Sequence, residues 1–319
     1  MCCLTCYFLS INMKITHQNQ DLVSVIMPVR NGSVFMVKAI NSIVNQTYKN
    51  WELLIIDDAS SDSTRTVMQE FKKQYPAKIR LFKTKRNLGA FAAANTVIQR
   101  AKGKYLAPMD SDDIAHFERL EKQVKFLHQN PNVILVGSNA EIIDQNDNLT
   151  GYKKYGLTHE EIYQQMSLIN PIVHPSCMIR KSMLPNPQKL YLTNFGVNSD
   201  YFTFFQLLNY GKFANLPENL LSYRIHGKNS SLVNLKAKFF NTIKIRLAAV
   251  KEFKYQMPFY VYPLLLIQVI IVSFIPGKLL LPIYLFIRGM RTQMNNNPSI
   301  MSQNNTLFNR VKYALTMLF

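Results

Sequence analysis

The sequence predicts an α/β protein whose first half is a doubly wound, mostly parallel sheet. Apolar segments typical of buried strands alternate with segments of helical spacing, and the alternation repeats four times in succession. Acidic residues follow two of the predicted strands, at Asp57–Asp58 and at Asp110–Asp113. Ligands of such sheets bind beyond the carboxyl ends of the strands, so these acids mark the predicted site.

Each element has its own local signal. The run "LVSVIMPV" (22–29) is apolar and β-branched, as expected of a strand buried on both faces, and "NGS" then makes a turn. "WELLIIDDAS" is a second such strand, and the serines after it favour a capped helix. The predicted order is strand 22–29, helix 34–46, strand 51–60, helix 61–75, strand 78–84, helix 87–103, strand 104–109, amphipathic helix 115–130 and strand 132–138.

The alternation stops near residue 150, and helices are predicted only near 159–169 and 200–210. An apolar run at 257–290 includes 258–276, which carries no charge but is interrupted by prolines. A buried helical hairpin is one interpretation. Its basic surroundings favour an interfacial or membrane-inserted element. The sequence therefore divides into an extension at 1–21, a folded domain at 22–231 and a basic, apolar helical tail at 232–319.

Charge is unevenly distributed along the 319 residues, whose formal net charge is +18. Residues 201–319 hold 14 Lys and Arg against 2 Asp and Glu, which favours an anionic membrane surface as a partner. No zinc-finger spacing, aromatic RNA-binding signature or Arg-rich arm supports nucleic acid. Three of the four cysteines lie in the first six residues, which is no disulfide framework. Cys177 is expected to be a packing residue, and residues 1–12 an extension outside the fold.

The segment "DSDD" at 110–113 places three like charges within four positions, which raises their pKa values unless something positive compensates. Capping of the following helix explains one acid at most. A D-x-D at a strand end is a hard oxygen site suited to Mg²⁺ or Mn²⁺. Because Asp57–Asp58 ends a neighbouring strand, both clusters face one crevice, and a nucleoside diphosphate with its metal accounts for both.

The segment "VSVIMPVRNGSVFMVKAINSIVNQTYKNWELLIIDDASSDST" (23–64) resembles the opening of family 2 glycosyltransferases. The later segments "RNLGAFAAAN", "GKYLAPMDSDD", "HPSCMIRKSML" and "NFGVNSDYFTFFQLLNYGKFANLPENLLSYRIHGKNSS" resemble that family in the same order, so the likeness covers roughly 22–231. It implies a GT-A fold with a nucleotide-sugar half at 22–113 and an acceptor half at 114–231. It also implies a bacterial surface-polysaccharide enzyme.

The resemblance assigns roles on the donor side. Asp58, with Asp57, meets the base, and Asp110 contacts the ribose or the metal. Asp112 is the expected metal ligand, and Asp113 shares that role or caps the next helix. His226 contacts the metal or diphosphate, and the cofactor is Mn²⁺ or Mg²⁺. The other donor contacts expected are Pro28, Arg30, Asn31, Asn87, Gly89 and Arg224, with Arg224 pairing with phosphate oxygens.

The family is inverting and uses a late carboxylate base, usually in an "ED" pair. Here the pair reads Ser199–Asp200, so Asp200 is the expected base and Ser199 departs from the usual Glu. Without the family context, a helix cap is the favoured interpretation of Asp200. His174 has an acceptor-site role or a structural one.

The expected reaction transfers a sugar from a nucleoside-diphosphate sugar, a UDP-sugar being favoured, to a glycan or lipid-linked acceptor. The expected location is the cytoplasmic face of the membrane. Two rivals remain open at this point: a polyprenyl-phosphate glycosyltransferase, and a non-catalytic membrane-bound scaffold that retains the fold.

Overall fold

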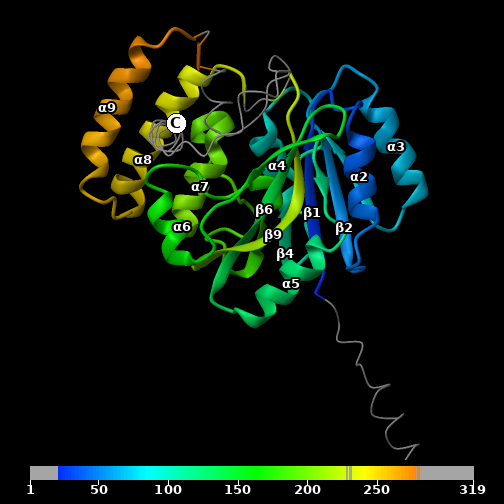
Figure 1. The fold of residues 1–319 in the computed structure, drawn as a ribbon. Coiled ribbons are helices and arrows are strands. Elements are labelled where there is room, and N and C mark those ends of the chain that lie inside the picture. Colours follow the sequence, from blue (N-terminus) through cyan, green and yellow to red (C-terminus); the bar gives the residue numbers. More distant parts are fainter. Residues whose placement is uncertain (1–20, 228, 230–231, 278, 281–319) are drawn as a thin grey trace, which may run out of the picture.

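A nine-stranded sheet with helices on both faces forms the centre of the molecule (Figure 1). The computed structural model describes residues 21–227, 229, 232–277 and 279–280, so the predicted extension and most of the segment 278–319 lie outside the described residues. The strand order is β3-β2-β1-β4-β8-β6-β9-β5, with β7 paired to β6. The strands are β1 Val23–Val29, β2 Trp51–Asp57, β3 Ile79–Lys83, β4 Tyr105–Pro108, β5 Ile114–Ala115, β6 Val133–Ile143, β7 Leu149–Lys153, β8 Met178–Arg180 and β9 Lys212–Arg224.

The first four predicted strands are confirmed as a parallel unit. β1 pairs in parallel with β2 and with β4, and β2 pairs with β3. Val29 stands opposite Asp57, and Ile26 opposite Pro108, so the carboxyl ends of β1, β2 and β4 meet at one edge. The loops that carry Asn31, Asp58 and Asp110 therefore start from the same edge of the sheet.

The second half of the sheet is mixed, so the prediction of a mostly parallel sheet is wrong there. The three-residue strand β8 lies between β4 and β6 and runs antiparallel to both. β9 is parallel to β6 and antiparallel to β5. A three-residue strand leaves no periodic signal, and its insertion keeps β6 from pairing directly with β4.

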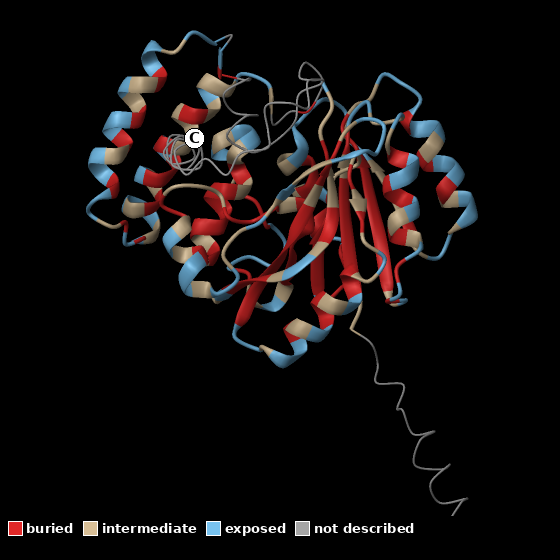
Figure 2. Ribbon diagram, in the orientation of Figure 1, coloured by how far each residue is buried: buried red, intermediate tan, exposed pale blue. Residues whose placement is uncertain are grey.

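Two apolar cores cover the two faces of the sheet, because alternate residues of a strand point to opposite sides. Val25 and Met27 of β1 pack with helices α2, α3 and α5. Ile26 packs toward α4 and the aromatic helix α7. Figure 2 shows the resulting buried strands between the two helical layers. The helices are α2 Met36–Val44, α3 Thr64–Gln74, α4 Ala90–Ile98, α5 Arg119–Gln129, α6 His159–Gln165, α7 Ser199–Leu207, α8 Leu235–Phe253 and α9 Val261–Phe274.

The C-terminal helices extend the layer on the α7 side. α8 packs against α7, and α9 packs against α8. Within the uncharged run 258–276, Val261–Phe274 forms the helix α9, which has 14 residues. Within the part of the chain that the structure describes, no helix combines the length and apolar character needed to cross a bilayer.

Candidate functional site

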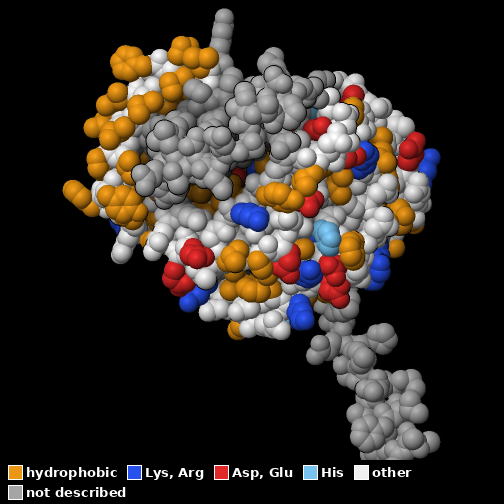
Figure 3. Space-filling view, viewed as in Figure 1, with side chains coloured by type: hydrophobic (Ala, Val, Ile, Leu, Met, Phe, Trp, Pro, Cys, Tyr) orange, Lys and Arg blue, Asp and Glu red, His pale blue; other side chains and the backbone are white. Residues whose placement is uncertain are grey.

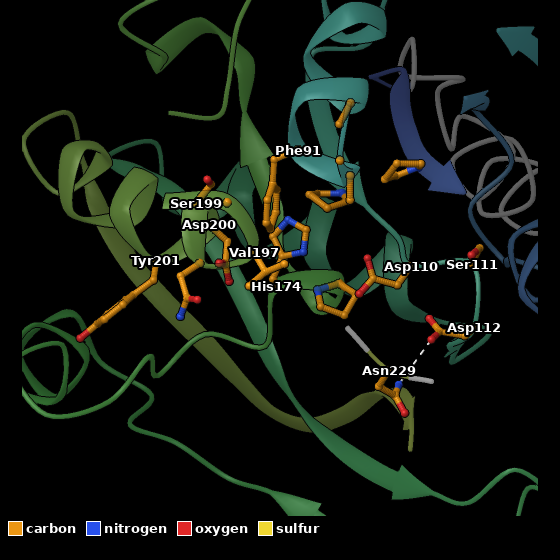
Figure 4. A pocket seen from close by; sticks show the side chains of 18 of the residues that line it. Phe91, Asp110, Ser111, Asp112, His174, Val197, Ser199, Asp200, Tyr201 and Asn229 are labelled. Carbon is orange, nitrogen blue, oxygen red and sulfur yellow. Dashed lines mark hydrogen bonds between the residues drawn. The ribbon is translucent and has the colours of Figure 1, made fainter. Parts of the chain in front are cut away.

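A cavity of about 1260 Å³ opens at the edge where β1, β2 and β4 end, and it continues to the start of α7 and one face of α8. Figure 4 shows Asp110 and Asp112 on one side and Asp200 on the other, with Phe91 and His174 between them. The cavity therefore has an acidic end at the sheet and a second end at α7. The predicted residues that line it are Pro28, Arg30, Asn31, Asp58, Asn87, Gly89, Asp110, Asp112, His174, Asp200 and His226.

The acidic end holds the three aspartates of the "DSDD" segment. Asp110, Asp112 and Asp113 each offer an oxygen, and these oxygens lie within 4.8 Å of one another. Burial and the neighbouring carboxylates of Asp112 and Asp200 raise the pKa of Asp110 to about 7. Burial, followed by the neighbouring carboxylates of Asp112 and Asp110, raises the pKa of Asp113 well above its usual range. Such crowding is relieved by a divalent cation, which takes carboxylate oxygens as ligands.

Asp113 supplies a direct test of whether a cation fits. Its side chain is buried, and its Oδ1 accepts the backbone N–H of Arg224 at 2.8 Å. Its Oδ2 has no hydrogen-bond partner among the described residues. A buried carboxylate oxygen without a partner is costly, and a metal ion in the cluster would satisfy it. The donor set present therefore fits Mg²⁺ or Mn²⁺.

Helix capping does not explain the cluster, and that alternative is wrong. The following helix α5 begins at Arg119, and its N-cap is Glu118. Residues 114–115 instead form the short strand β5, which pairs with β9. The predicted helix 115–130 therefore starts four residues late, and Asp113 ties the loop to β9 rather than to a helix.

Arg224 stands behind the cluster, which differs from its predicted role. Its side chain is fully buried and is not among the cavity-lining residues. Its Nε donates to the carbonyl oxygen of Asp112 at 2.7 Å, and its Nη1 donates to the carbonyl oxygen of Asp144 at 2.9 Å and pairs with Asp147. The guanidinium also lies over the ring of Phe35. Arg224 thus braces the aspartate loop, and this placement gives no support to direct pairing with phosphate.

His226 lies beside the cluster. Its Nε2 is 2.9 Å from Oδ2 of Asp112, and its ring packs against Phe35 at a centroid distance of 5.0 Å. Asn229 also approaches Asp112 Oδ2, at 3.5 Å. Through these contacts, the segment after β9 fixes the orientation of the Asp112 carboxylate.

Asp57 and Asp58 have different positions despite being neighbours. Asp58 lines the cavity, and its oxygens accept the backbone N–H groups of Leu88 and Gly89 at 2.9 and 2.8 Å. Asp57 does not line the cavity, since its oxygens accept from Ser60 N–H at 2.8 Å and from Arg65 Nε at 2.5 Å. These bonds hold the Asp57 pKa below its usual range in spite of burial. Asp57 therefore shapes the loop rather than facing a ligand.

The loops near Asp58 are held in conformations that suit a close ligand approach. Asn31 has a φ of 51°, and its Oδ1 accepts the backbone N–H of Ser61 at 2.9 Å. Gly89 has a φ of 85°, which a residue with a side chain rarely adopts. Asn87 Oδ1 accepts the Gly89 N–H at 3.1 Å. The Asn31 bond joins the loop after β1 to the loop after β2, and the Asn87 bond orders the turn before α4.

Asp200 occupies the other end of the cavity, in the first turn of α7. The N-cap of this helix is Asn198, so the structure does not place Asp200 at the cap. Asn170 Nδ2 donates to Asp200 Oδ2 at 3.1 Å. Burial raises the Asp200 pKa to about 6, although hydrogen bonds from the helix backbone and Asn170 act in the opposite direction. A carboxylate with this pKa is suited to accept a proton near neutral pH.

Ser199, which departs from the family pattern, lies in the wall next to Asp200. It is buried, and its Oγ has no hydrogen-bond partner among the described residues. Its carbonyl oxygen accepts from Thr203 Oγ1 at 2.7 Å, a bond within α7. The Ser199–Asp200 pair therefore contributes one acidic side chain to the cavity, that of Asp200.

His174 separates the two ends. Its Nε2 is 2.8 Å from the Tyr191 hydroxyl, and its ring packs against Phe91. Burial, followed by the charge of Arg119, lowers the His174 pKa to about 3. The imidazole is therefore neutral at physiological pH and offers hydrogen bonding rather than charge.

Several basic side chains at or behind the cavity wall were not predicted from the sequence. Lys153 lines the cavity, and its charge lowers the pKa of Asp110. Arg119 is fully buried, and its Nη2 donates to the carbonyl oxygens of Pro108 and Cys177 at 2.9 and 3.0 Å, which fixes the end of β4. Lys238 and Arg246 of α8 also line the cavity. Isolated basic residues on amphipathic segments carry no signal that separates them from solvated ones.

Cys177 is confirmed as a buried packing residue. Burial raises the pKa of its thiol to about 12, so it holds no reactive thiolate at neutral pH.

Comparison with known proteins identifies the family. The model described as "Glycosyl transferase family 2" matches residues 24–185. The chain belongs to glycosyl transferase family 2. An uncharacterized glycosyltransferase of Haemophilus influenzae is 34% identical over 224 residues, covering 68% of this chain and 69% of that protein.

Two further relatives of glycosyl transferase family 2 have more specific names. The putative teichuronic acid biosynthesis glycosyltransferase TuaG of Bacillus subtilis is 29% identical over 219 residues, covering 68% of this chain and 84% of that protein. The Escherichia coli UDP-Glc:alpha-D-GlcNAc-diphosphoundecaprenol beta-1,3-glucosyltransferase WfgD is 41% identical over 125 residues. That match covers 39% of this chain and 48% of WfgD.

Solved structures show the same GT-A-type fold at low sequence identity. TarS residues 1–349 of S. aureus, in complex with UDP-GlcNAc, has a TM-score of 0.57 and 16% identity, covering 72% of this chain and 66% of that one. The mannosyltransferase PcManGT of Pyrobaculum calidifontis, in complex with GDP-Man and Mn²⁺, has a TM-score of 0.54 and 15% identity. It covers 87% of this chain and 90% of the other. These similarities establish the fold.

Proposed function

We propose that this protein is a metal-dependent, inverting glycosyltransferase that moves a sugar from a nucleoside-diphosphate sugar, favouring a UDP-sugar, to a hydroxyl of a glycan or lipid-linked glycan. One observation carries the proposal: a single cavity joins the three-aspartate cluster to a separate, partly buried carboxylate, Asp200. The names of TuaG and WfgD, and the UDP-GlcNAc complex of TarS, support a role in surface-polysaccharide synthesis and a UDP-linked donor.

The donor binds at the acidic end in this proposal. Asp58 and the loops that carry Asn31 and Gly89 form the nucleotide site at the ends of β1 and β2, where parallel sheets bind ligands. Asp110 lies at the end of β4, within reach of the ribose or the metal. The other lining residues of this end are Pro28, Arg30, Asn87, Lys153 and His226.

Asp112 and Asp113, with Asp110, would hold a divalent cation, and His226 orients Asp112. When bound, Mn²⁺ or Mg²⁺ supplies positive charge that stabilises the departing diphosphate. Lys153 adds a fixed cation at the same end. The chain itself excludes water from Asp113 and keeps the aspartate loop in place through Arg224.

Asp200 acts as the base in this proposal. One Asp200 oxygen takes the proton of the acceptor hydroxyl while the hydroxyl oxygen of the acceptor forms a bond to the sugar C1. The bond from C1 to the donor phosphate oxygen breaks in the same step, and the nucleoside diphosphate leaves with the electron pair. A single displacement from the opposite face inverts C1, so no covalent enzyme intermediate forms.

The stereochemistry of the product tests this function. With Mn²⁺ and an α-linked UDP-sugar, we expect the newly formed C1 centre to be β, observed by proton NMR before mutarotation. Water serves as the acceptor where the natural acceptor is unknown, so slow donor hydrolysis is sufficient. An α product formed first would show retention and exclude the single displacement.

We also propose that the protein works at the cytoplasmic face of a membrane through its C-terminal helices. Figure 3 shows hydrophobic side chains gathered over α9. Phe259 and Phe274 are 88% and 84% exposed, and Leu266 and Ile270 lie exposed between them. α8 presents Lys244 and Lys251 to solvent. An apolar face with basic neighbours fits the surface of an anionic bilayer.

Flotation with vesicles tests the membrane proposal. The wild-type protein is expected to float with vesicles that contain anionic lipid and less with zwitterionic ones. The double variant Leu266→Asp and Ile270→Asp should lose most of this binding, whereas Leu157→Asp, at an exposed apolar position before α6, should keep it. Equal flotation of the double variant and the wild type would exclude α9 as the binding face.

A further inference from the structure

Helix α8 forms part of the cavity wall, although its sequence belongs to the segment predicted as a membrane tail. The residues that it contributes lie at positions i, i+3, i+4, i+7 and i+11, so they share one face of the helix. α8 packs against α7, the helix that carries Asp200. This face therefore borders the place where the acceptor hydroxyl must meet the base. Its lining residues are Leu235, Lys238, Phe239, Thr242 and Arg246.

The charges at this end of the cavity do not balance. Lys238 and Arg246 bring two cations, while Asp200 is the one carboxylate that the described parts of α7 and α8 place in the lining. Arg246 is nearly fully buried, and its Nε donates to the Tyr201 hydroxyl at 3.1 Å while its Nη2 donates to the carbonyl oxygen of Leu168. Both acceptors are neutral, so these contacts leave the charge of Arg246 uncompensated.

The electrostatic state of Lys238 agrees with this imbalance. Burial lowers its pKa to about 8, and the opposing charge of Asp200 does not restore the ordinary value. Lys238 is still mostly protonated at pH 7. The described residues that α7 and α8 place in the lining carry a net positive charge, and a half-buried ammonium among them favours an anionic ligand.

We propose that Lys238 binds a phosphate group of the acceptor, so that the acceptor is a sugar that carries a phosphate or diphosphate close to its reacting hydroxyl. This inference rests on the proposed glycosyltransferase function. α9, with its exposed apolar face, packs on the helix that carries Lys238. A lipid-linked acceptor could place its phosphate at Lys238 and its apolar chain along α9. A water-soluble sugar phosphate would contact Lys238 but would have no apolar chain for α9.

A binding experiment separates this inference from the function on which it rests. The full-length protein is first saturated with UDP and Mn²⁺, which occupies the donor site, and farnesyl diphosphate is then titrated in by calorimetry. Failure of the wild-type protein to bind UDP would count against the proposed function itself. UDP binding without diphosphate binding would overturn only the acceptor inference.

Variants locate the binding to Lys238. Lys238→Gln should weaken farnesyl diphosphate binding by about 10- to 100-fold, the loss expected for one charge-assisted contact. Lys238→Arg should retain most of the affinity, and it keeps the test valid if the glutamine variant folds poorly. The matched control is Lys244→Gln, which removes an exposed lysine from the same helix but outside the cavity, and it should bind as the wild type does.

Two further ligands identify the source of the phosphate. Inorganic pyrophosphate that binds as tightly as farnesyl diphosphate would assign a water-soluble phosphate acceptor, and tighter binding of the farnesyl compound would assign a lipid-linked one. Farnesol that binds as tightly as farnesyl diphosphate would overturn the inference, because the phosphate would then contribute nothing. Equal losses of farnesyl diphosphate affinity in Lys238→Gln and Lys244→Gln would also overturn the inference, because binding would then depend on the general charge of the surface and not on Lys238.

Discussion

Asp200→Asn is expected to lower the rate of sugar transfer by about 10³-fold, within the range that a positioned general base contributes. Asparagine keeps the shape of the side chain and its contact with Asn170, but it cannot accept the hydroxyl proton. Transfer is measured as nucleoside diphosphate release at saturating donor and Mn²⁺. Glu70→Gln, which removes an exposed carboxylate from α3, is the control and should keep the wild-type rate.

The pH profile gives an independent check on the same residue. The Asp200 pKa is raised to about 6, and the base works only when deprotonated. Activity of the wild-type protein should therefore fall as the pH drops through about 6, rather than near 4 as for an ordinary aspartate. The residual activity of Asp200→Asn should lack this fall. An unchanged profile in the variant would assign the titration to another group.

Asp112→Asn is expected to abolish the Mn²⁺-dependent part of UDP binding. The three carboxylates converge on one position, and the loss of a ligand removes both a charge and a metal bond. We expect UDP affinity in the presence of Mn²⁺ to fall by at least about 10- to 100-fold, a loss that outer partners of metal ligands alone can cause. Calorimetry of UDP with Mn²⁺ and with EDTA measures it.

Two comparisons make the Asp112 test specific. The wild-type protein should show a large difference between Mn²⁺ and EDTA, and Asp112→Asn should show little. Glu70→Gln should behave as the wild type does. If the wild-type protein bound UDP equally well with Mn²⁺ and with EDTA, UDP binding would not depend on the metal, and the proposed metal site would be wrong.

The parallel half of the fold was predictable because its strands are apolar and separated by helices. β1, β2 and β4 each left a buried run, and their register brings Asp58 and Asp110 to one edge, as expected from the sequence. The mixed half of the sheet was not predictable, because β8 has only three residues and pairs with strands that are distant in the sequence.

Site residues that cluster in the sequence were predictable. Site residues whose role depends on how they pack in the fold were not. Three aspartates in four positions already indicate a carboxylate cluster from the sequence alone. Arg224 looked like a phosphate ligand because a basic residue near the motif is ambiguous, and only its burial behind Asp112 shows the bracing contacts. α8 looked like part of a tail because overall charge and hydropathy do not reveal which face of a helix meets a cavity.

The central claim is that the two ends of the cavity have separate tasks, donor binding at the aspartate cluster and proton removal at Asp200. Calorimetric titration of UDP into Asp200→Asn, in the presence of Mn²⁺, tests it most directly alongside the transfer assay. We expect Asp200→Asn to bind UDP with an affinity close to that of the wild-type protein although it has lost transfer. Loss of UDP binding together with transfer, or transfer at the wild-type rate, would contradict it.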